Sequence, residues 1–249
     1  MATSSVLGTT GRSPIGCGTR SGQPTGRTLR TPERPLNGPL VLGPGASAHR
    51  TLLYASGMDD QRLLERTVES EEIYRGAYLA YRVDTIEDAD GHRHTRQVVV
   101  HPGAVAMIPI HAGQVLMVRQ YRTPAAEVML ELPAGTLDRL DDGTIEFPDV
   151  AAPRELGEET GYHAATWRKL GSFYTAPGFA TELMHLYLAT DLTPIPGYAG
   201  PEPDERLELR RIPVAEAVRM AETDEIHDAK SKLGLFWLQR LIDRGEVAV

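Results

Sequence analysis

The sequence has a single cysteine, no long apolar run and few aromatic residues. Cys17 is the only cysteine among 249 residues, which excludes a disulfide framework and a zinc site built from cysteines. No stretch approaches the ~18 consecutive apolar residues of a membrane-spanning helix, so an integral membrane protein is excluded. The 26 basic residues are outnumbered by 34 acidic ones, and the net charge of -8 argues against a basic nucleic-acid-binding surface. We therefore expect a cytoplasmic protein with one large or two modest domains.

The first 57 residues differ in composition from the rest of the chain. Six arginines stand against one acid, Glu33, and glycine, proline, serine and threonine supply more than half of residues 1–57. We expect a disordered basic tail, because no period of 2 or 3.6 is present. Three interpretations stay open: a transit peptide, a nucleic-acid-binding arm, and an unstructured extension from an early start codon, with Met58 as the true first residue. The last is favoured, since neither an amphipathic helix nor stacking aromatics accompany the arginines.

Regular patterns begin after Leu63. Three alternating segments predict a small antiparallel β unit within residues 58–101, with strands at 64–73, 76–87 and 93–101. The second unit, residues 102–249, is predicted to contain a buried hairpin, 103–110 and 114–122, around His111-Ala112-Gly113. Further strands are expected at 167–174, 183–190 and 206–211, and helices near 150–160, 214–222 and 228–244, with a Pro/Gly-rich loop over 193–204. Helices on both sides of a mixed sheet predict an α/β sandwich.

The strongest chemical signal is an acidic motif over residues 154–162, in and just after the helix expected near 150–160. Glu155, Glu158 and Glu159 stand at i, i+3 and i+4, so their carboxylates share one helix face and repel one another. A divalent cation would compensate this repulsion, and hard oxygen ligands suit Mg²⁺ or Mn²⁺. Gly161 is expected to end the helix. Pro153 is tolerated only in a first turn, so the helix is predicted to begin no earlier than about Val150.

The spacing of these residues resembles the Nudix box. Seven residues separate Glu146 from Arg154, and Arg154-Glu155-Leu156-x-Glu158-Glu159-x-Gly161 follows the signature position by position. Ten residues separate Gly135 from Glu146 where the signature has five, so the loop 137–144 is predicted to carry an insertion. Four ordered motifs extend the resemblance to the bacterial ADP-ribose pyrophosphatase branch of the Nudix superfamily, at residues 96–105, 119–122, 131–135 and 176–182.

This resemblance implies a fold, a reaction and a set of metal ligands. The implied fold is a Nudix α/β/α sandwich whose N-terminal β unit is exchanged between the two subunits of a homodimer. The implied reaction is hydrolysis of ADP-ribose, or of a related nucleoside diphosphate sugar, at its pyrophosphate. Glu155, Glu159 and the Ala134 carbonyl would bind the metal, and Glu158 would act directly or through water. Glu182 would position or deprotonate the attacking water.

Other site residues follow from the same resemblance. Arg122 matches an arginine that contacts the phosphates of the substrate in this family, and Arg96 matches a second substrate-binding position. Gln97 stands where the family usually has a glutamate that helps to hold the base. Tyr78 either stacks on the base or, as the favoured interpretation, packs within an alternating strand. Arg154 is expected to hold Glu146 or Glu158 in place, so that Gly135, Glu146, Arg154 and Gly161 form the structural part of the box.

The histidines are not spaced as a metal site. We expect His92 and His94 to be solvated, and His101, His163 and His185 to be structural.

Two alternatives to ADP-ribose hydrolysis remain. One is a non-catalytic module that binds an ADP-ribose-like ligand as a sensor, and the other is a Nudix hydrolase specific for another nucleotide sugar. The presence of every carboxylate named above favours an enzyme.

Overall fold

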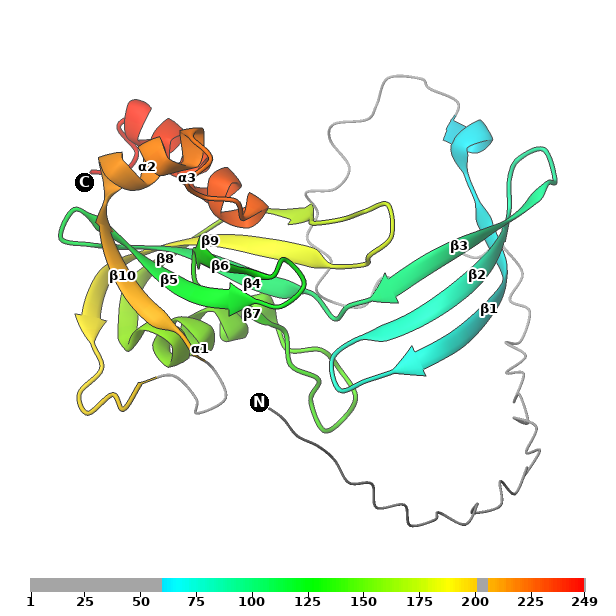
Figure 1. Ribbon diagram of the computed structural model, residues 1–249, viewed down its shortest axis with the longest axis horizontal. Helices are drawn as coiled ribbons and strands as arrows, with labels where there is room; N and C mark the ends of the chain where they lie inside the picture. Colours follow the sequence, from blue (N-terminus) through cyan, green and yellow to red (C-terminus); the bar gives the residue numbers. More distant parts are fainter. Residues whose placement is uncertain (1–59, 201–205, 249) are drawn as a thin grey trace, which may run out of the picture. The chain divides into compact units, whose positions relative to one another are not determined.

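The computed structural model describes residues 60–200 and 206–248 (Figure 1). The predicted tail, residues 1–57, and the start proposed at Met58 lie outside the described residues. So do residues 201–204 of the predicted Pro/Gly-rich loop. Within the described ranges, no helix combines the length and the apolar character that crossing a membrane requires.

The first described elements are a short 3₁₀ helix, Asp60–Leu63, and a three-stranded antiparallel sheet. The strands are β1 (Arg66–Arg75), β2 (Ala80–Glu87) and β3 (Arg93–Val100), in the order β1-β2-β3. Asp88 begins the β2–β3 turn, where its side chain accepts the backbone N–H groups of Asp90 (3.0 Å) and His92 (2.9 Å). Gly91 has the positive φ of 84° that this turn requires.

The strand predicted over 76–87 was too long at its beginning. Gly76 donates its N–H to the carbonyl of Leu79 (2.8 Å), which closes a turn between β1 and β2. Tyr78 therefore lies in this turn and is 70% exposed, so packing within a strand is the wrong interpretation for this residue.

A second sheet has seven strands and contains β4, in which every residue except the last, His111, is buried. Its central order is β10-β5-β4-β9-β8, and β6 pairs with β5 while β7 pairs with β4. The strands are β4 (Ala104–His111), β5 (Gln114–Arg122), β6 (Glu127–Glu131), β7 (Ala134–Thr136), β8 (Tyr162–Tyr174), β9 (Leu183–Pro194) and β10 (Glu208–Pro213). β4 runs parallel to β9 and antiparallel to β5 and β7, so the sheet is mixed as expected.

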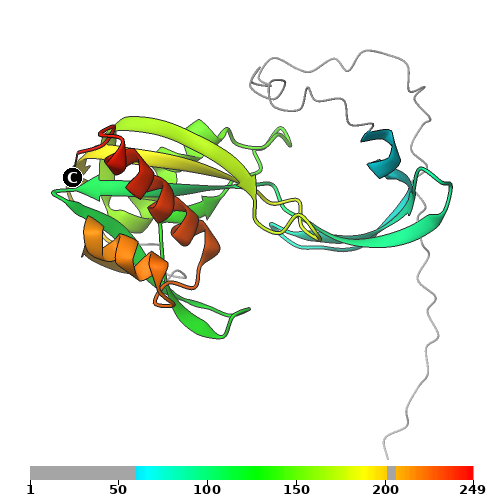
Figure 2. The ribbon, with the colours of Figure 1, turned by 90° about the horizontal axis from the view of Figure 1, so that it is seen from above.

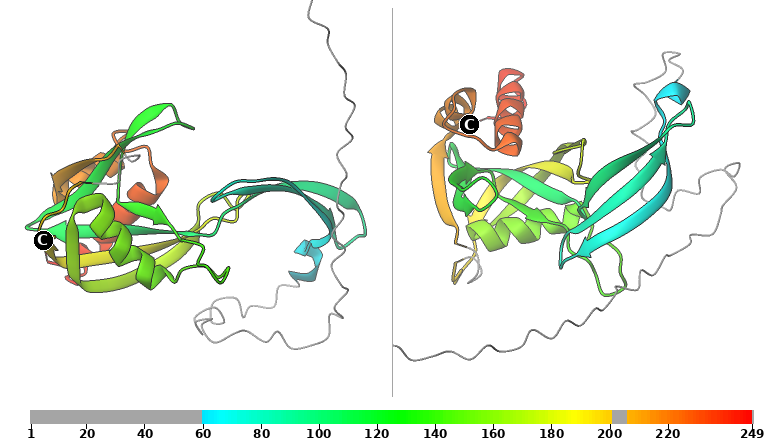
Figure 3. Two further views of the ribbon diagram at one scale, coloured as in Figure 1. Left: turned by 90° about the horizontal axis from the view of Figure 1, so that it is seen from below. Right: turned by 45° about the vertical axis from the view of Figure 1, so that its right-hand side comes forward.

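Helices cover both faces of this sheet. Along β4, Ala106 and Ile108 belong to the core under α2 (Val214–Glu222) and α3 (Ala229–Asp243), whereas Val105 and Met107 belong to the core under α1 (Pro148–Thr160). Successive side chains of a strand point to opposite faces, which is why an uninterrupted apolar run suits a strand between two helical layers. Figures 2 and 3 show α2 and α3 side by side on one face, opposite α1. The predicted α/β/α sandwich is confirmed.

Helix α1 begins earlier than predicted. Its first turn contains Pro148, whose missing N–H is no loss at that position, and the N–H of Ala151 donates to the carbonyl of Phe147 (3.0 Å). Pro153 consequently lies inside the helix and not in its first turn, contrary to the expected start at Val150. The predicted end is confirmed: Gly161 has a left-handed φ of 73° and donates its N–H to the carbonyl of Gly157 (3.0 Å).

Candidate active site

A cleft of about 700 Å³ lies among strand ends and the first turn of α3. It brings together residues from four separate parts of the sequence. Residues singled out in the sequence that line it are Arg122, Glu131, Ala134, Gly135 and Glu182. The cleft also includes residues for which the sequence predicted no role at the site, among them His101, Asp228 and Lys230.

The acidic face of α1 lies against β7, whose residues Ala134, Gly135 and Thr136 line this cleft, whereas Glu155, Glu158 and Glu159 do not line it themselves. Glu159 is buried, and its carboxylate accepts the backbone N–H of Ala134 (3.0 Å). The carboxylate of Glu155 covers the next residue, Gly135, where an added Cβ would lie 1.9 Å from the carboxyl carbon. Glycine is therefore the one residue that permits this close approach of helix and strand. The two carboxylates and the backbone of β7 form one compact group.

Arg154 pairs with several of the surrounding acids. Its Nη2 and Nε atoms donate to the carboxylate of Glu146 (2.8 and 3.2 Å), while Nη1 lies 2.9 Å from both Glu155 and Glu158. The hydrogen bonds to Glu146 raise the pKa of Arg154 above its ordinary value. The same bonds hold the pKa of the nearly buried Glu146 below its usual range, against the effect of burial. Arg154 therefore contacts both Glu146 and Glu158, the two partners expected from the sequence.

The donor set on α1 fits a hard divalent cation. Glu155, Glu158 and Glu159 offer only oxygen atoms, which Mg²⁺ and Mn²⁺ prefer, and Gly135 leaves room for the carboxylate of Glu155 beside the strand. A different group, Asp88, Asp90 and His92, has ligand atoms within 4.8 Å of one another in the part of the chain that the structure describes. That group is an exposed turn whose polar atoms already bond to one another, and His92 and His94 are exposed as expected.

A buried carboxylate orients Arg122. Glu131 is 1% exposed and accepts hydrogen bonds from Nε and Nη2 of Arg122, both at 2.7 Å. Lys230 donates to the same carboxylate and to Asp228 (2.9 Å). Burial alone would raise the pKa of Glu131, but the hydrogen bonds from Arg122 and the charge of Lys230 lower it. The guanidinium at the cleft is thus fixed by an ionised, fully paired acid.

Sequence reasoning missed Lys230 because its partner is 99 residues away. The available signal was local: Asp228 precedes a helical pattern by one residue, and an aspartate there is typical of a helix N-cap. Asp228 is the N-cap of α3 and accepts the N–H of Ser231 (3.0 Å).

Glu182 lies in the loop before β9 and faces His101. Its Oε1 atom is 3.5 Å from Nε2 of His101, and its Oε2 atom accepts the hydroxyl of Thr175. His101 therefore has an acidic neighbour in the cleft, which its interpretation as a structural histidine did not foresee.

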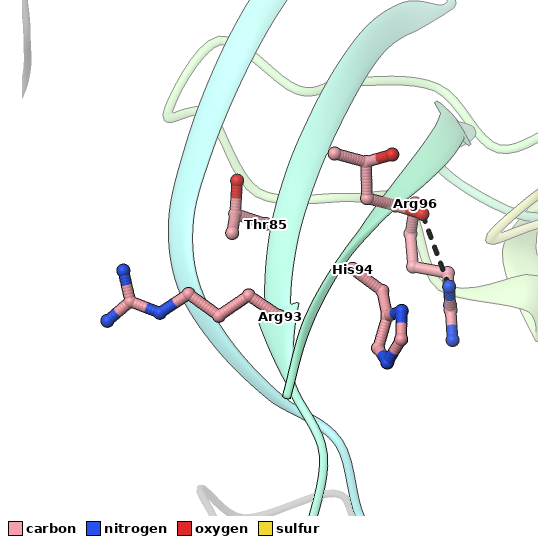
Figure 4. Close-up of a pocket in the computed structure, with 5 residues that line it drawn as sticks. Thr85, Arg93, His94 and Arg96 are labelled. Carbon is pink, nitrogen blue, oxygen red and sulfur yellow. Dashed lines mark hydrogen bonds between the residues drawn. The ribbon is translucent and has the colours of Figure 1, made fainter. Parts of the chain in front are cut away.

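Three substrate-side residues do not line the cleft. Tyr78, Arg96 and Gln97 all lie on the three-stranded sheet or its turn. Arg96 forms an ion pair with Glu65 and lines a separate open hollow with Thr85, Arg93 and His94. The dashed line in Figure 4 marks its hydrogen bond to the backbone carbonyl of Thr95 (3.2 Å). Their predicted contact with substrate stays a prediction, since none of the three lines the cleft in the described part of the chain.

Comparison with known proteins identifies the family. The model of the NUDIX domain matches residues 100–233. The chain belongs to the Nudix family. It is 35% identical over 178 residues to an ADP-ribose pyrophosphatase of Bacillus subtilis, covering 71% of this chain and 94% of that relative. It is 39% identical over 176 residues, 70% of this chain and 92% of the relative, to the methanol dehydrogenase activator of Bacillus methanolicus.

A solved structure agrees with this assignment. A crystal structure of an ADP compounds hydrolase superposes with a TM-score of 0.61 at 25% sequence identity, and the match covers 74% of this chain and 97% of that one. The Nudix sandwich with its mixed sheet is thereby shared over nearly the whole of the neighbour.

Hydrogen bonds between Asp138 and Glu146 close the base of the loop in which the insertion is predicted. Asp138 and Glu146 bond to each other twice: the N–H of Glu146 donates to the Asp138 carbonyl (2.8 Å), and the N–H of Asp138 donates to the Glu146 carboxylate (3.3 Å). Residues between them can therefore be added without moving Glu146 relative to Arg154, which preserves the register of the Nudix helix.

Replacing Arg154 tests the energetic importance of its ion pairs. Because Glu146 would remain buried without its partner, R154M should lower the free energy of unfolding at pH 7 by about 1–3 kcal/mol. The pKa of Glu146 is lowered in the folded protein from the ordinary value of 4.5, so its contribution is present above pH 4.5 and disappears as the pH falls through the folded pKa. Urea unfolding at pH 7 and pH 3 should show the difference between wild type and R154M narrowing in acid.

The matched control is R139M, which removes an exposed arginine of the neighbouring loop. It should change the free energy of unfolding by less than about 0.5 kcal/mol at either pH. A loss in R154M that is equal at both pH values would contradict the assigned ion pair.

Proposed function

We propose that this chain is a divalent-metal-dependent pyrophosphohydrolase. Its substrate is ADP-ribose, which water splits at the pyrophosphate into AMP and ribose 5-phosphate, or a closely related nucleoside diphosphate sugar. The observation that carries the proposal is the acidic face of α1, where Glu155 and Glu159 lie against Ala134 and Gly135, two residues that line the cleft. The 35% identity to an ADP-ribose pyrophosphatase supports this choice of substrate.

The proposed metal ligands are Glu155, Glu159 and the backbone carbonyl of Ala134, with Glu158 acting directly or through water. Held by these residues, Mg²⁺ or Mn²⁺ would supply positive charge to neutralise the pyrophosphate and would lower the pKa of the attacking water. Arg154 supports this set by holding the side chains of Glu155 and Glu158 on one side of α1.

Glu182 is our candidate for the residue that positions or deprotonates the attacking water. Its side chain lines the cleft from the wall formed by the loop before β9, and the hydroxyl of Thr175 fixes one of its oxygens. Arg122 is the candidate phosphate ligand, because a guanidinium pre-oriented by Glu131 suits the planar oxygens of a phosphate group.

The test of this function is a panel of nucleotides. Purified protein with Mg²⁺ is offered ADP-ribose, GDP-mannose, other nucleoside diphosphate sugars and dinucleotides, and the products are separated chromatographically. ADP-ribose should yield AMP and ribose 5-phosphate in equal amounts, at a higher kcat/KM than the other compounds. Fastest turnover of another sugar would support the nucleotide-sugar alternative, and tight binding of ADP-ribose without turnover would support the sensor alternative.

Variants of two glutamates connect the activity to this cleft. Loss of an outer-shell partner of a metal typically costs 10- to 100-fold, so E159Q, which alters a direct ligand, should lower kcat by more than about 100-fold. The matched control is E222Q at the exposed end of α2, which should retain the rate of the wild type. Full activity of E159Q at saturating Mg²⁺ would reject its role as a ligand.

We also infer a homodimer in which the three-stranded sheet completes the cleft of the partner subunit. This inference accounts for Tyr78, Arg96 and Gln97, which match substrate-side positions but do not line the cleft of their own chain. Arg96 would then reach the substrate, and Gln97 and Tyr78 would contact the base.

Mixing two inactive variants tests this arrangement. In a heterodimer of R96A and E159Q, one cleft combines an intact Nudix helix with an intact sheet from the other subunit. Equal amounts of the two variants are unfolded, mixed and refolded together, so that about half of the dimers are heterodimers with one intact cleft. The mixture should therefore recover up to about a quarter of wild-type activity. No recovery from two variants that are each inactive, or full activity of R96A alone, would contradict the exchange.

A further inference from the structure

His101 occupies the connection between β3 and β4 at the edge of the cleft. Its side chain is mostly buried, and both the ring and the backbone are held by neighbours. The backbone N–H of His101 donates to the hydroxyl oxygen of Thr181 (2.9 Å), and that hydroxyl donates back to the carbonyl of His101 (3.1 Å). Because Thr181 directly precedes Glu182, these bonds fix the distance between the histidine and the loop that carries the glutamate.

The surroundings of the ring select one tautomer. The backbone N–H of Gly103 donates to Nδ1 of His101 (3.0 Å), so Nδ1 must carry a lone pair. Burial lowers the pKa of His101, and the opposing effect of the Glu182 charge is smaller, so the ring is neutral near pH 7. A neutral imidazole with Nδ1 as acceptor carries its proton on Nε2.

This Nε2–H group faces the carboxylate of Glu182. Nε2 lies 3.5 Å from Oε1, and the hydroxyl of Thr175 donates to Oε2 from the other side. A distance of 3.5 Å is longer than a well-formed hydrogen bond, but catalytic contacts often tighten only when substrate is bound. Each oxygen of Glu182 thus has a donor beside it.

We propose that His101 is a positioning residue for Glu182. Its Nε2–H group and the Thr175 hydroxyl restrict rotation of the Glu182 carboxylate, so that a remaining lone pair is directed toward the attacking water. His101 itself does not contact the substrate. This inference rests on the proposed role of Glu182 in the hydrolysis.

A purely structural role for His101 makes a different prediction. In that case only Nδ1 matters, because it holds the turn at Gly103, whose φ of 109° is in the left-handed region. Two substitutions separate the two ring nitrogens. The amide of H101Q can place an N–H near the Nε2 position, whereas the Oδ1 atom of H101N can accept the Gly103 N–H but cannot reach Glu182.

The experiment compares kcat, KM and melting temperature for both variants with ADP-ribose. We expect H101N to lose about 10- to 100-fold in kcat with an unchanged KM, because a small misplacement of a reacting group has effects of this size. H101Q should retain kcat within about threefold of the wild type even if its melting temperature falls. Full activity of H101N, or an activity that follows the melting temperature in both variants, would overturn the proposal.

A double variant shows whether His101 acts through Glu182. In an E182Q background, adding H101N should cause no further loss of kcat, since the residue that His101 positions is already disabled. An undiminished loss in the double variant would overturn the proposal.

A spectroscopic readout keeps this inference separate from the proposed function. Long-range ¹H–¹⁵N NMR of the full chain should show the Nε2–H tautomer of His101, with an Nε2 resonance that shifts in E182Q. If the wild type hydrolyses no member of the nucleotide panel, the proposed function fails, while the NMR result still decides the contact. A proton on Nδ1, or an Nε2 resonance insensitive to E182Q, would overturn the inference.

Discussion

Mutual repulsion of carboxylates on α1 is the physical constraint around which this Nudix domain is arranged. Glu155, Glu158 and Glu159 share one face of a helix, where like charges destabilise it. The fold does not disperse them: Arg154 lies among them, and the backbone of Ala134 and Gly135 approaches so closely that Gly135 has no room for a side chain. An arrangement that concentrates negative charge directly behind the cleft residues Ala134 and Gly135 is suited to a divalent cation and, through it, to a pyrophosphate.

The rest of the sandwich supplies rigid supports for this group. β4 is buried on both faces, and its parallel partner β9 begins directly after Glu182, so the loop bearing Glu182 is anchored to β4 on the side opposite to β7. The fully paired Glu131 of β6 joins this strand to β5 through Arg122 and to the first turn of α3 through Lys230. Charged groups in the cleft therefore come from ordered elements whose positions are set by the two apolar cores.

The sequence could predict what depends on local patterns and short spacings. The hairpin around His111, the C-cap at Gly161 and the helices over 214–222 and 228–244 are confirmed, because periodicity and turn residues decide them. Pro153 misled the prediction of the start of α1, since Pro148 already provides a suitable first turn. The neighbours of Glu131 and Glu182 could not be predicted: Lys230 and His101 reach them across 99 and 81 residues, and no local pattern encodes such pairings. The predicted roles of the site residues themselves stay predictions.

The most direct test of the central claim is Mn²⁺ binding, measured by electron paramagnetic resonance on the folded chain with and without a non-hydrolysable ADP-ribose analogue. The account predicts that wild type and E222Q bind Mn²⁺ alike, that the analogue tightens binding, and that E159Q weakens it by at least about tenfold. Failure of the wild type to take up Mn²⁺ under either condition, or unchanged affinity in E159Q, would contradict it.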